Sequence, residues 1–465
     1  MQTDKPQIGL LGIMQELYDD SIPDITERQE NYARKVCKQL EEVADWHFPG
    51  AARNREDIER ILAGFNHQNL DGVMIVMLTY GPSMRTVRAL KKNHLPILLA
   101  NIQPVPEVEK DWDMEDLTLN QGIHGAQDMA NALIRTTDPR FEVISSDWKS
   151  REFKDYISGW ARAARAAGAL KKMKIAAFGK MHGMGDTLSD EAAFTRMIGP
   201  EVNREYIGEI YKTMERVSDE EIEKQMKTDR KNFDVDDNMP EENFRYAVRM
   251  YLEFKTFLET KEYAGFSAHF DVFQGDGRFE QIHMLAASNL LADGYGYAAE
   301  GDTNTASMVA AGHILEENAH FTEMYAMDFS RGSMLMSHMG EGNWKIARKD
   351  RPVRLANREL GIGGLENPPT TVFMAEPGPA TMVSLVHLEG EKFRLVAAYG
   401  DILDTEEIPT IEMPYFHFKP YSGVRKCNDG WLRHGGTHHQ TLHLGDQRQK
   451  WKMLCRILGI EYVEV

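Results

Sequence analysis

The sequence predicts an α/β protein in which two doubly wound α/β domains precede a β-rich, barrel-like domain. Three observations predict it. Strand and helix patterns alternate over the first hundred residues, the alternation starts again at Met173, and short β-rich segments replace it from about Ala319. A chain of 465 residues is also too long for one hydrophobic core. We therefore expect domains at residues 1–172, 173–318 and 319–465.

In the first domain, apolar runs of strand length alternate with amphipathic segments. The runs cover residues 7–14, 70–78 and 95–100. Between the first two, Tyr32, Val36 and Leu40 recur at helical spacing, and Pro82 is placed to open a further helix. Strands that alternate with helices in this way form a parallel sheet that is covered on both faces.

The second domain repeats this pattern, and the third departs from it. Residues 174–178 and 264–269 predict strands, and the charged stretch between them predicts helices around a loop at residues 234–238. Further strands are predicted at residues 371–374, 381–388 and 392–398, with Gly and Pro between them. This last pattern is typical of a mostly antiparallel sheet or a barrel.

Composition narrows the classes of function. A formal net charge of −18 repels nucleic acids and anionic lipids and favours a neutral or cationic ligand, and a neutral sugar fits this expectation. No apolar run approaches the ~20 residues that cross a bilayer, and the N-terminus lacks the features of a signal peptide. The three cysteines are too few and too scattered for a disulfide framework. We therefore expect a cytoplasmic protein without a nucleic acid or membrane partner.

Four clusters of acidic and histidine residues in the second half could carry chemistry. They are GYGYAAEGD with Glu300, FTEMY with Glu323, SHMGE with His338, and GGTHH with His438 and His439. Each has an ordinary structural alternative, such as a solvated loop carboxylate or a hydrogen-bonded structural histidine. Adjacent histidines in a strand point to opposite faces, so only one of the last pair is expected to meet a given metal.

Taken together, the clusters offer two carboxylates and two imidazoles. Such a set suits a divalent ion of intermediate hardness, such as Mn²⁺, with coordination positions left for substrate oxygens. The spacing alone does not show that these residues meet. The sequence contains none of the motifs GxGxxG, GxxxxGK[ST], CxxC or HExxH.

The four clusters, in this order, resemble motifs of the L-arabinose isomerases. Two upstream segments strengthen the resemblance: NQGIHG, which begins at Asn120, is similar to the family's Asn-Gln-x-x-His-Gly, and QELY, which begins at Gln15, to its Gln-x-Leu-Tyr. The resemblance extends over nearly the whole chain. It implies a hexamer built as a dimer of trimers, with active sites between subunits.

The resemblance also implies an aldose–ketose isomerase that converts L-arabinose, or a related aldose such as D-galactose, through an enediol. The implied ligands of Mn²⁺, or of Co²⁺ or Mg²⁺, are Glu300, Glu323, His338 and His439. Of these, Glu300 and Glu323 are the implied catalytic acid and base. The implied sugar-binding residues are Asp302, Phe321, Glu341 and His438, with Gln15, Leu17, Tyr18, Gln121 and His124 from a neighbouring subunit.

One departure from the family concerns the residues after Glu300. Thr303 and Asn304 stand where the family has Trp and Lys. We expect them to give a roomier, more polar pocket rim and a broader sugar preference. The alternatives are an isomerase of the same architecture for another aldose, or a sugar-binding relative without turnover. The ligand set alone also permits a metallohydrolase.

Overall fold

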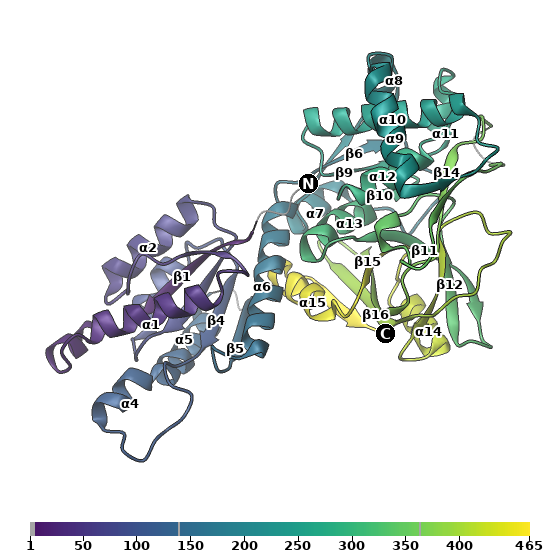
Figure 1. The fold of residues 1–465 in the computed structure, drawn as a ribbon. Coiled ribbons are helices and arrows are strands. Elements are labelled where there is room, and N and C mark those ends of the chain that lie inside the picture. Colours follow the sequence, from purple (N-terminus) through teal and green to yellow (C-terminus); the bar gives the residue numbers. More distant parts are fainter. Residues whose placement is uncertain (1–4, 138–139, 362–363) are drawn as a thin grey trace. The chain divides into compact units, whose positions relative to one another are not determined.

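The computed structural model describes residues 5–137, 140–361 and 364–465. Contacts divide these residues into two compact units (Figure 1). The N-terminal unit comprises residues up to 168 together with 452–459. The larger unit comprises residues 169–451 and 460–465. None of the described helices has both the length and the apolar composition needed to cross a bilayer.

The N-terminal unit is built on a five-stranded parallel sheet of order β2-β1-β3-β4-β5. Its strands are β1 (Gln7–Ile13), β2 (Asp45–His47), β3 (Gly72–Met77), β4 (Ile97–Asn101) and β5 (Phe141–Ser145). Its helices are α1 (Ile25–Gln39), α2 (Arg55–His67), α3 (Val87–Leu90), α4 (Met114–Asn120), α5 (Gly122–Thr136) and α6 (Arg151–Leu170). The three predicted strands are present. Close packing needs Gly72, because a Cβ there would lie 2.8 Å from the Trp160 ring.

The larger unit begins with a four-stranded parallel sheet of order β10-β9-β6-β7. The strands are β6 (Lys174–Phe178), β7 (Glu201–Arg204), β9 (Gly265–Ala268) and β10 (Gly296–Ala299). The associated helices are α7 (Glu191–Met197), α8 (Gly208–Met214), α9 (Asp219–Asn232), α10 (Glu241–Thr260), α11 (Asp271–Asp276), α12 (Met284–Ala292) and α13 (Thr303–Leu315). Residues 296–299 of the GYGYAAEGD motif form the buried strand β10 and not a solvated loop. Gly265 on β9 permits the close approach of this strand, since a Cβ on Gly265 would lie 2.5 Å from the Gly296 carbonyl oxygen.

The rest of this unit is an antiparallel barrel, as the sequence predicts. Six strands close in the order β15-β18-β11-β12-β17-β16, with β16 pairing back to β15. They are β11 (His320–Asp328), β12 (Ser333–Ser337), β15 (Gly378–His387), β16 (Phe393–Ile402), β17 (Tyr415–Pro420) and β18 (His439–Leu444). The strand β19 (Glu461–Glu464) pairs in parallel with β16. The last two helices are α14 (Val424–Arg433) and α15 (Arg448–Leu458).

The loop predicted at residues 234–238 is partly a strand. β8 (Phe233–Val235) pairs in parallel with β13 (Val353–Asn357), which pairs antiparallel with β14 (Pro369–Val372). The partner strand is more than a hundred residues away, so local periodicity could not reveal it. One apolar core then joins the helices around the parallel sheet to the barrel, with Phe244 and Leu285 in the same cluster as Met336.

The buried carboxyl group of Asp229 on α9 predicts how the stability of the fold depends on pH. Burial raises the pKa of Asp229 to about 7, despite hydrogen bonds from the side chains of Gln225 and Asn289. Between about pH 4 and pH 7 the folded state keeps this proton while the unfolded state loses it, so stability falls as pH rises. We expect Asp229→Asn to flatten this fall in a denaturation series, whereas the exposed control Asp237→Asn keeps it. Equal pH slopes in both variants would contradict the assignment.

Candidate active site

Strand register in the barrel brings three of the four implied ligands together. Glu323 on β11 stands directly opposite His439 on β18, and on its other side it pairs with Ser337, which precedes His338. Directly paired residues have Cβ atoms about 4.5–5.5 Å apart. Glu323 Oε1 accordingly lies 3.2 Å from His439 Nε2 and 3.7 Å from His338 Nε2.

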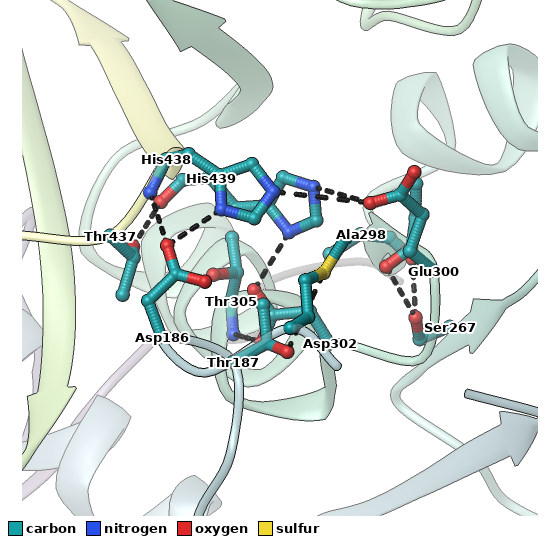
Figure 2. A network of polar contacts seen from close by, with 12 residues as sticks. Asp186, Thr187, Ser267, Ala298, Glu300, Asp302, Thr305, Thr437, His438 and His439 are labelled. Carbon is teal, nitrogen blue, oxygen red and sulfur yellow. Dashed lines mark hydrogen bonds and ion pairs between the residues drawn. The ribbon is translucent and has the colours of Figure 1, made fainter. Parts of the chain in front are cut away.

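The fourth implied ligand, Glu300, comes from the parallel sheet. It follows β10 with a left-handed backbone, φ +64°, and its amide donates to the Ala268 carbonyl at 2.9 Å. The next residue must be glycine, because a Cβ on Gly301 would lie 2.6 Å from the Gly179 carbonyl oxygen. This turn brings Glu300 Oε2 to 3.6 Å from His439 Nε2 (Figure 2).

Both histidines of the adjacent pair face this cluster, unlike the expectation that only one would. His438 Nε2 lies 3.9 Å from Glu300 Oε2 and 3.7 Å from Glu323 Oε1, and the two imidazole centroids are 4.1 Å apart. The alternation rule does not apply because His438 precedes the first residue of β18. Two groups of three possible metal ligands result, Glu300 with His438 and His439, and Glu323 with His338 and His439.

Asp186 is a site residue that the sequence analysis missed. Its Oδ2 accepts hydrogen bonds from His438 Nδ1 at 2.6 Å and from the His438 backbone amide at 2.9 Å (Figure 2). The contact raises the pKa of His438 to about 10 and lowers that of Asp186 to about 2. A signal was available, because Asp186 lies in the glycine-containing loop after β6, and ligand-binding residues gather beyond the carboxyl ends of parallel strands.

Two buried carboxylates hold the far side of the implied ligand imidazoles. Asp302 Oδ2 accepts from His439 Nδ1 at 2.9 Å, and its Oδ1 accepts from the Thr305 backbone amide at 3.0 Å, capping α13. Glu341 Oε2 lies 2.9 Å from His338 Nδ1. Such contacts fix which imidazole nitrogen carries the proton and leave the other as a lone-pair donor.

The implied sugar-binding residues Asp302, Phe321 and Glu341 are almost completely buried. The Phe321 ring centroid lies 4.7 Å from that of His338 and 5.0 Å from that of His439. The observed contacts of these three residues are thus with the imidazoles, and their contact with a sugar stays a prediction. His438 is different, because 39% of its side chain is exposed.

Neighbouring charged groups offset the effect of burial on the pKa values of Glu323 and His439. Burial alone would raise the pKa of Glu323, but His338 and His439 hold it below its ordinary value. Burial alone would lower the pKa of His439, but Asp302 and Glu323 raise it to about 9. These are strongly coupled carboxylate–imidazole pairs.

The donor set fits a divalent cation. His439 Nδ1 donates to Asp302, while the buried Nε2 has no hydrogen-bond partner among the described residues. His439 Nε2 faces the carboxylates of Glu300 and Glu323, and its lone pair can bind a cation that displaces the Nε2 proton. Imidazole nitrogen with carboxylate oxygen is a combination that ions such as Mn²⁺ accept.

Thr303 and Asn304 do not lie exposed at the pocket edge, and the broader sugar preference expected from them stays a prediction. They begin α13 and are 8% and 3% exposed. The Asn304 side chain accepts a hydrogen bond from the Ser189 hydroxyl at 3.0 Å. Asn304 therefore contacts the loop that carries Asp186.

The remaining predicted residues lie in the N-terminal unit. Gln15, Leu17 and Tyr18 follow β1, and Gln121 and His124 lie at the start of α5. Gln121 Nε2 donates to the Tyr18 hydroxyl at 3.0 Å. The start of α5 approaches the end of β3, since a Cβ on Gly122 would lie 2.3 Å from the Met77 carbonyl oxygen. These residues thus share the carboxyl edge of their own sheet.

Comparison with known proteins agrees with this geometry. Three family models match consecutive parts of the chain: the L-arabinose isomerase N-terminal domain at residues 3–172, the central domain at 174–318 and the C-terminal domain at 318–461. The chain belongs to the L-arabinose isomerase family. As a member of the L-arabinose isomerase family it is an enzyme, an aldose–ketose isomerase.

Relatives in the L-arabinose isomerase family match over almost their full length. The L-arabinose isomerase of Leuconostoc mesenteroides is 28% identical over 95% of this chain and 96% of that protein. Those of Pediococcus pentosaceus and Geobacillus kaustophilus are 29% and 27% identical, over 94% and 95% of this chain and 94% and 93% of those proteins.

Proposed function

We propose that this enzyme interconverts L-arabinose and its ketose with the help of a divalent cation, Mn²⁺ in the first instance. One observation carries the proposal: His439 Nε2 is buried without a hydrogen-bond partner among the described residues and faces both Glu300 and Glu323. His338 completes the ligand set, with Glu341 behind it. When bound, the cation would polarise the sugar oxygens and stabilise the negative charge that develops on them.

The chain's own residues would move the protons. One carboxylate of the Glu300 and Glu323 pair takes the proton from C2, which gives an enediol, and a proton is then returned to C1. A hydroxyl proton also moves from O2 to O1, so the aldose and the ketose contain the same atoms and no oxidant or reductant is needed. His438 is placed to contact the sugar because its exposed imidazole faces both carboxylates and Asp186 holds its other nitrogen.

The names of the relatives support L-arabinose as the substrate. Another aldose, such as D-galactose, is the alternative within the same reaction. The departure from the family pattern at Thr303 and Asn304 supports that alternative, because Asn304 contacts Ser189 in the loop that carries Asp186. The presence of all four implied ligands weighs against a non-catalytic relative and, with the family, against a metallohydrolase.

The test is an isomerisation assay on a panel of aldoses. We expect turnover of L-arabinose that is lost after treatment with a chelator and restored by Mn²⁺ or Co²⁺. Adding Ca²⁺, which prefers six to eight oxygen ligands, should restore little and serves as the control. Full activity in rigorously metal-free enzyme would overturn the role of the cation. Absence of L-arabinose turnover beside activity on another aldose would overturn the substrate.

We also propose that the sites are shared between subunits of a cytoplasmic homo-hexamer. The support is the group of Gln15, Tyr18, Gln121 and His124 at one sheet edge, with Leu17 and Ile123 exposed beside them. In the larger unit, a cavity of about 840 Å³ beside His438 is bordered by Phe329 and Leu432, which are also exposed. Exposed apolar side chains of this kind mark contact surfaces. The cytoplasmic location is supported by three unpaired cysteines.

Complementation between variants tests the shared site. His124→Ala and His439→Ala should each be nearly inactive, because each damages every site of a homo-oligomer. Mixed and allowed to exchange subunits, they should regain part of the activity, since some sites then receive two intact halves. A mixture of His124→Ala with Gln121→Ala, from the same half, is the matched control and should regain none. A fully active monomer in dilute solution would contradict the proposal.

A further inference from the structure

A line of buried polar side chains leads from His338 into the core around the parallel sheet. Glu341 Oε2 contacts His338 Nδ1 at 2.9 Å, and the other carboxylate oxygen accepts a hydrogen bond from the Tyr297 hydroxyl at 2.6 Å. The Tyr297 hydroxyl in turn lies 3.0 Å from His283 Nε2. All four side chains are at most 4% exposed, so water does not compete for these contacts.

The direction of each hydrogen bond follows from the chemistry of the groups. Burial raises the pKa of Tyr297 well above its ordinary value, so the hydroxyl keeps its single hydrogen and donates it to Glu341. The Tyr297 oxygen can then only accept, and His283 Nε2 must be the donor. Burial lowers the pKa of His283 to about 4, so it is neutral with its hydrogen on Nε2.

The surroundings of His283 hold its ring in place. The imidazole stacks on Phe273 with centroids 4.8 Å apart and an interplanar angle of 15°. It also lies 6.0 Å from the ring of Phe254. His283 thus begins the line of contacts from within an apolar core. It lies outside the four motifs, whereas Tyr297 lies within GYGYAAEGD, the motif named for Glu300.

We propose that Tyr297 and His283 are positioning residues, which orient Glu341 so that it holds His338 with Nε2 free for the metal. The proposal rests on the proposed function, since it presupposes that His338 is a metal ligand. Neither Glu341 Oε2 nor His338 Nδ1 has a hydrogen-bond partner among the described residues, so the 2.9 Å ion pair between them is the contact that places each relative to the other. Without the Tyr297 hydroxyl, Glu341 would lose the partner of its Oε1 and could turn away.

The experiment measures the dissociation constant of Mn²⁺ by calorimetry on the full-length protein. Tyr297→Phe keeps the ring and its packing, and we expect Mn²⁺ to bind about 10–100-fold more weakly. Tyr295→Phe is the matched control, a buried tyrosine two residues away that makes no contact with the ligand set. It should bind Mn²⁺ as the parent does. Saturating Mn²⁺ should restore most of kcat in Tyr297→Phe.

Two further variants separate positioning from general damage to the core. His283→Gln retains a side-chain N–H donor and should bind Mn²⁺ more tightly than His283→Phe does. Combining Tyr297→Phe with Glu341→Gln should weaken binding little beyond Glu341→Gln alone, because Tyr297 acts through Glu341. Parent-like Mn²⁺ affinity in Tyr297→Phe, or fully additive effects in the double variant, would overturn the inference. If the parent itself binds no Mn²⁺, it is the proposed metal dependence that fails.

Discussion

Replacing either Glu323 or Glu300 by Gln is expected to lower kcat by about 10²–10⁴-fold, because general acid–base groups contribute that much. Gln keeps the shape of the side chain but cannot take up a proton. The two residues come from different elements, yet both approach His439 Nε2, at 3.2 and 3.6 Å. We therefore expect losses of similar size. The measurement is kcat on L-arabinose at saturating Mn²⁺, with Mn²⁺ binding followed separately.

The exposed Glu317, which follows the C-cap of α13, provides the matched control. Glu317→Gln makes the same chemical change outside the site and should leave kcat within about twofold of the parent, as surface substitutions usually do. If Glu323→Gln or Glu300→Gln kept near-parent kcat with Mn²⁺ bound, that residue would have no part in proton transfer.

Apolar runs in the sequence are sufficient to predict several buried strands of the two parallel sheets. The apolar runs at residues 7–14, 70–78 and 174–178 each correspond to a strand, because buried parallel strands must be apolar on both faces. Two strands that the sequence did not predict, β8 and β10, are determined by contacts with segments that are distant in the sequence or that pack against them in the fold. β10 begins with Gly296, where a Cβ would lie 2.1 Å from the Ala306 carbonyl oxygen, and β8 pairs with β13, which is distant in the sequence.

For the candidate site too, the sequence predicts some features, and others depend on the fold. The motifs single out Glu300, Glu323, His338 and His439, which the structure brings together through the β11, β12 and β18 register and the turn after β10. They could not indicate that both histidines of the pair face the carboxylates, since His438 precedes the first residue of β18 and is held by Asp186, 252 residues away. They also could not separate residues that would touch the sugar from residues behind the imidazoles, because that distinction is one of burial.

Asp302→Asn is expected to weaken Mn²⁺ binding by about 10–100-fold while the fold is retained. The reason lies in the two hydrogen bonds of this carboxylate. The Thr305 backbone amide is a fixed donor, so the oxygen of the new Asn side chain must face it and keep the cap of α13. The Asn amide group then faces His439 Nδ1, where Asp302 Oδ2 now accepts. His439 Nδ1 must become the acceptor, and the ring proton moves to Nε2.

A proton on His439 Nε2 would occupy the lone pair that faces Glu300 and Glu323, so the imidazole could no longer bind the cation. The matched control is Asp190→Asn, which makes the same substitution at the N-cap of α7, where the side chain accepts only from the backbone amides of Ala192 and Ala193. It should leave Mn²⁺ affinity unchanged. Calorimetry measures both variants, and thermal unfolding of the metal-free proteins shows that the caps persist. Parent-like Mn²⁺ affinity in Asp302→Asn would mean that Asp302 does not set the tautomer of His439.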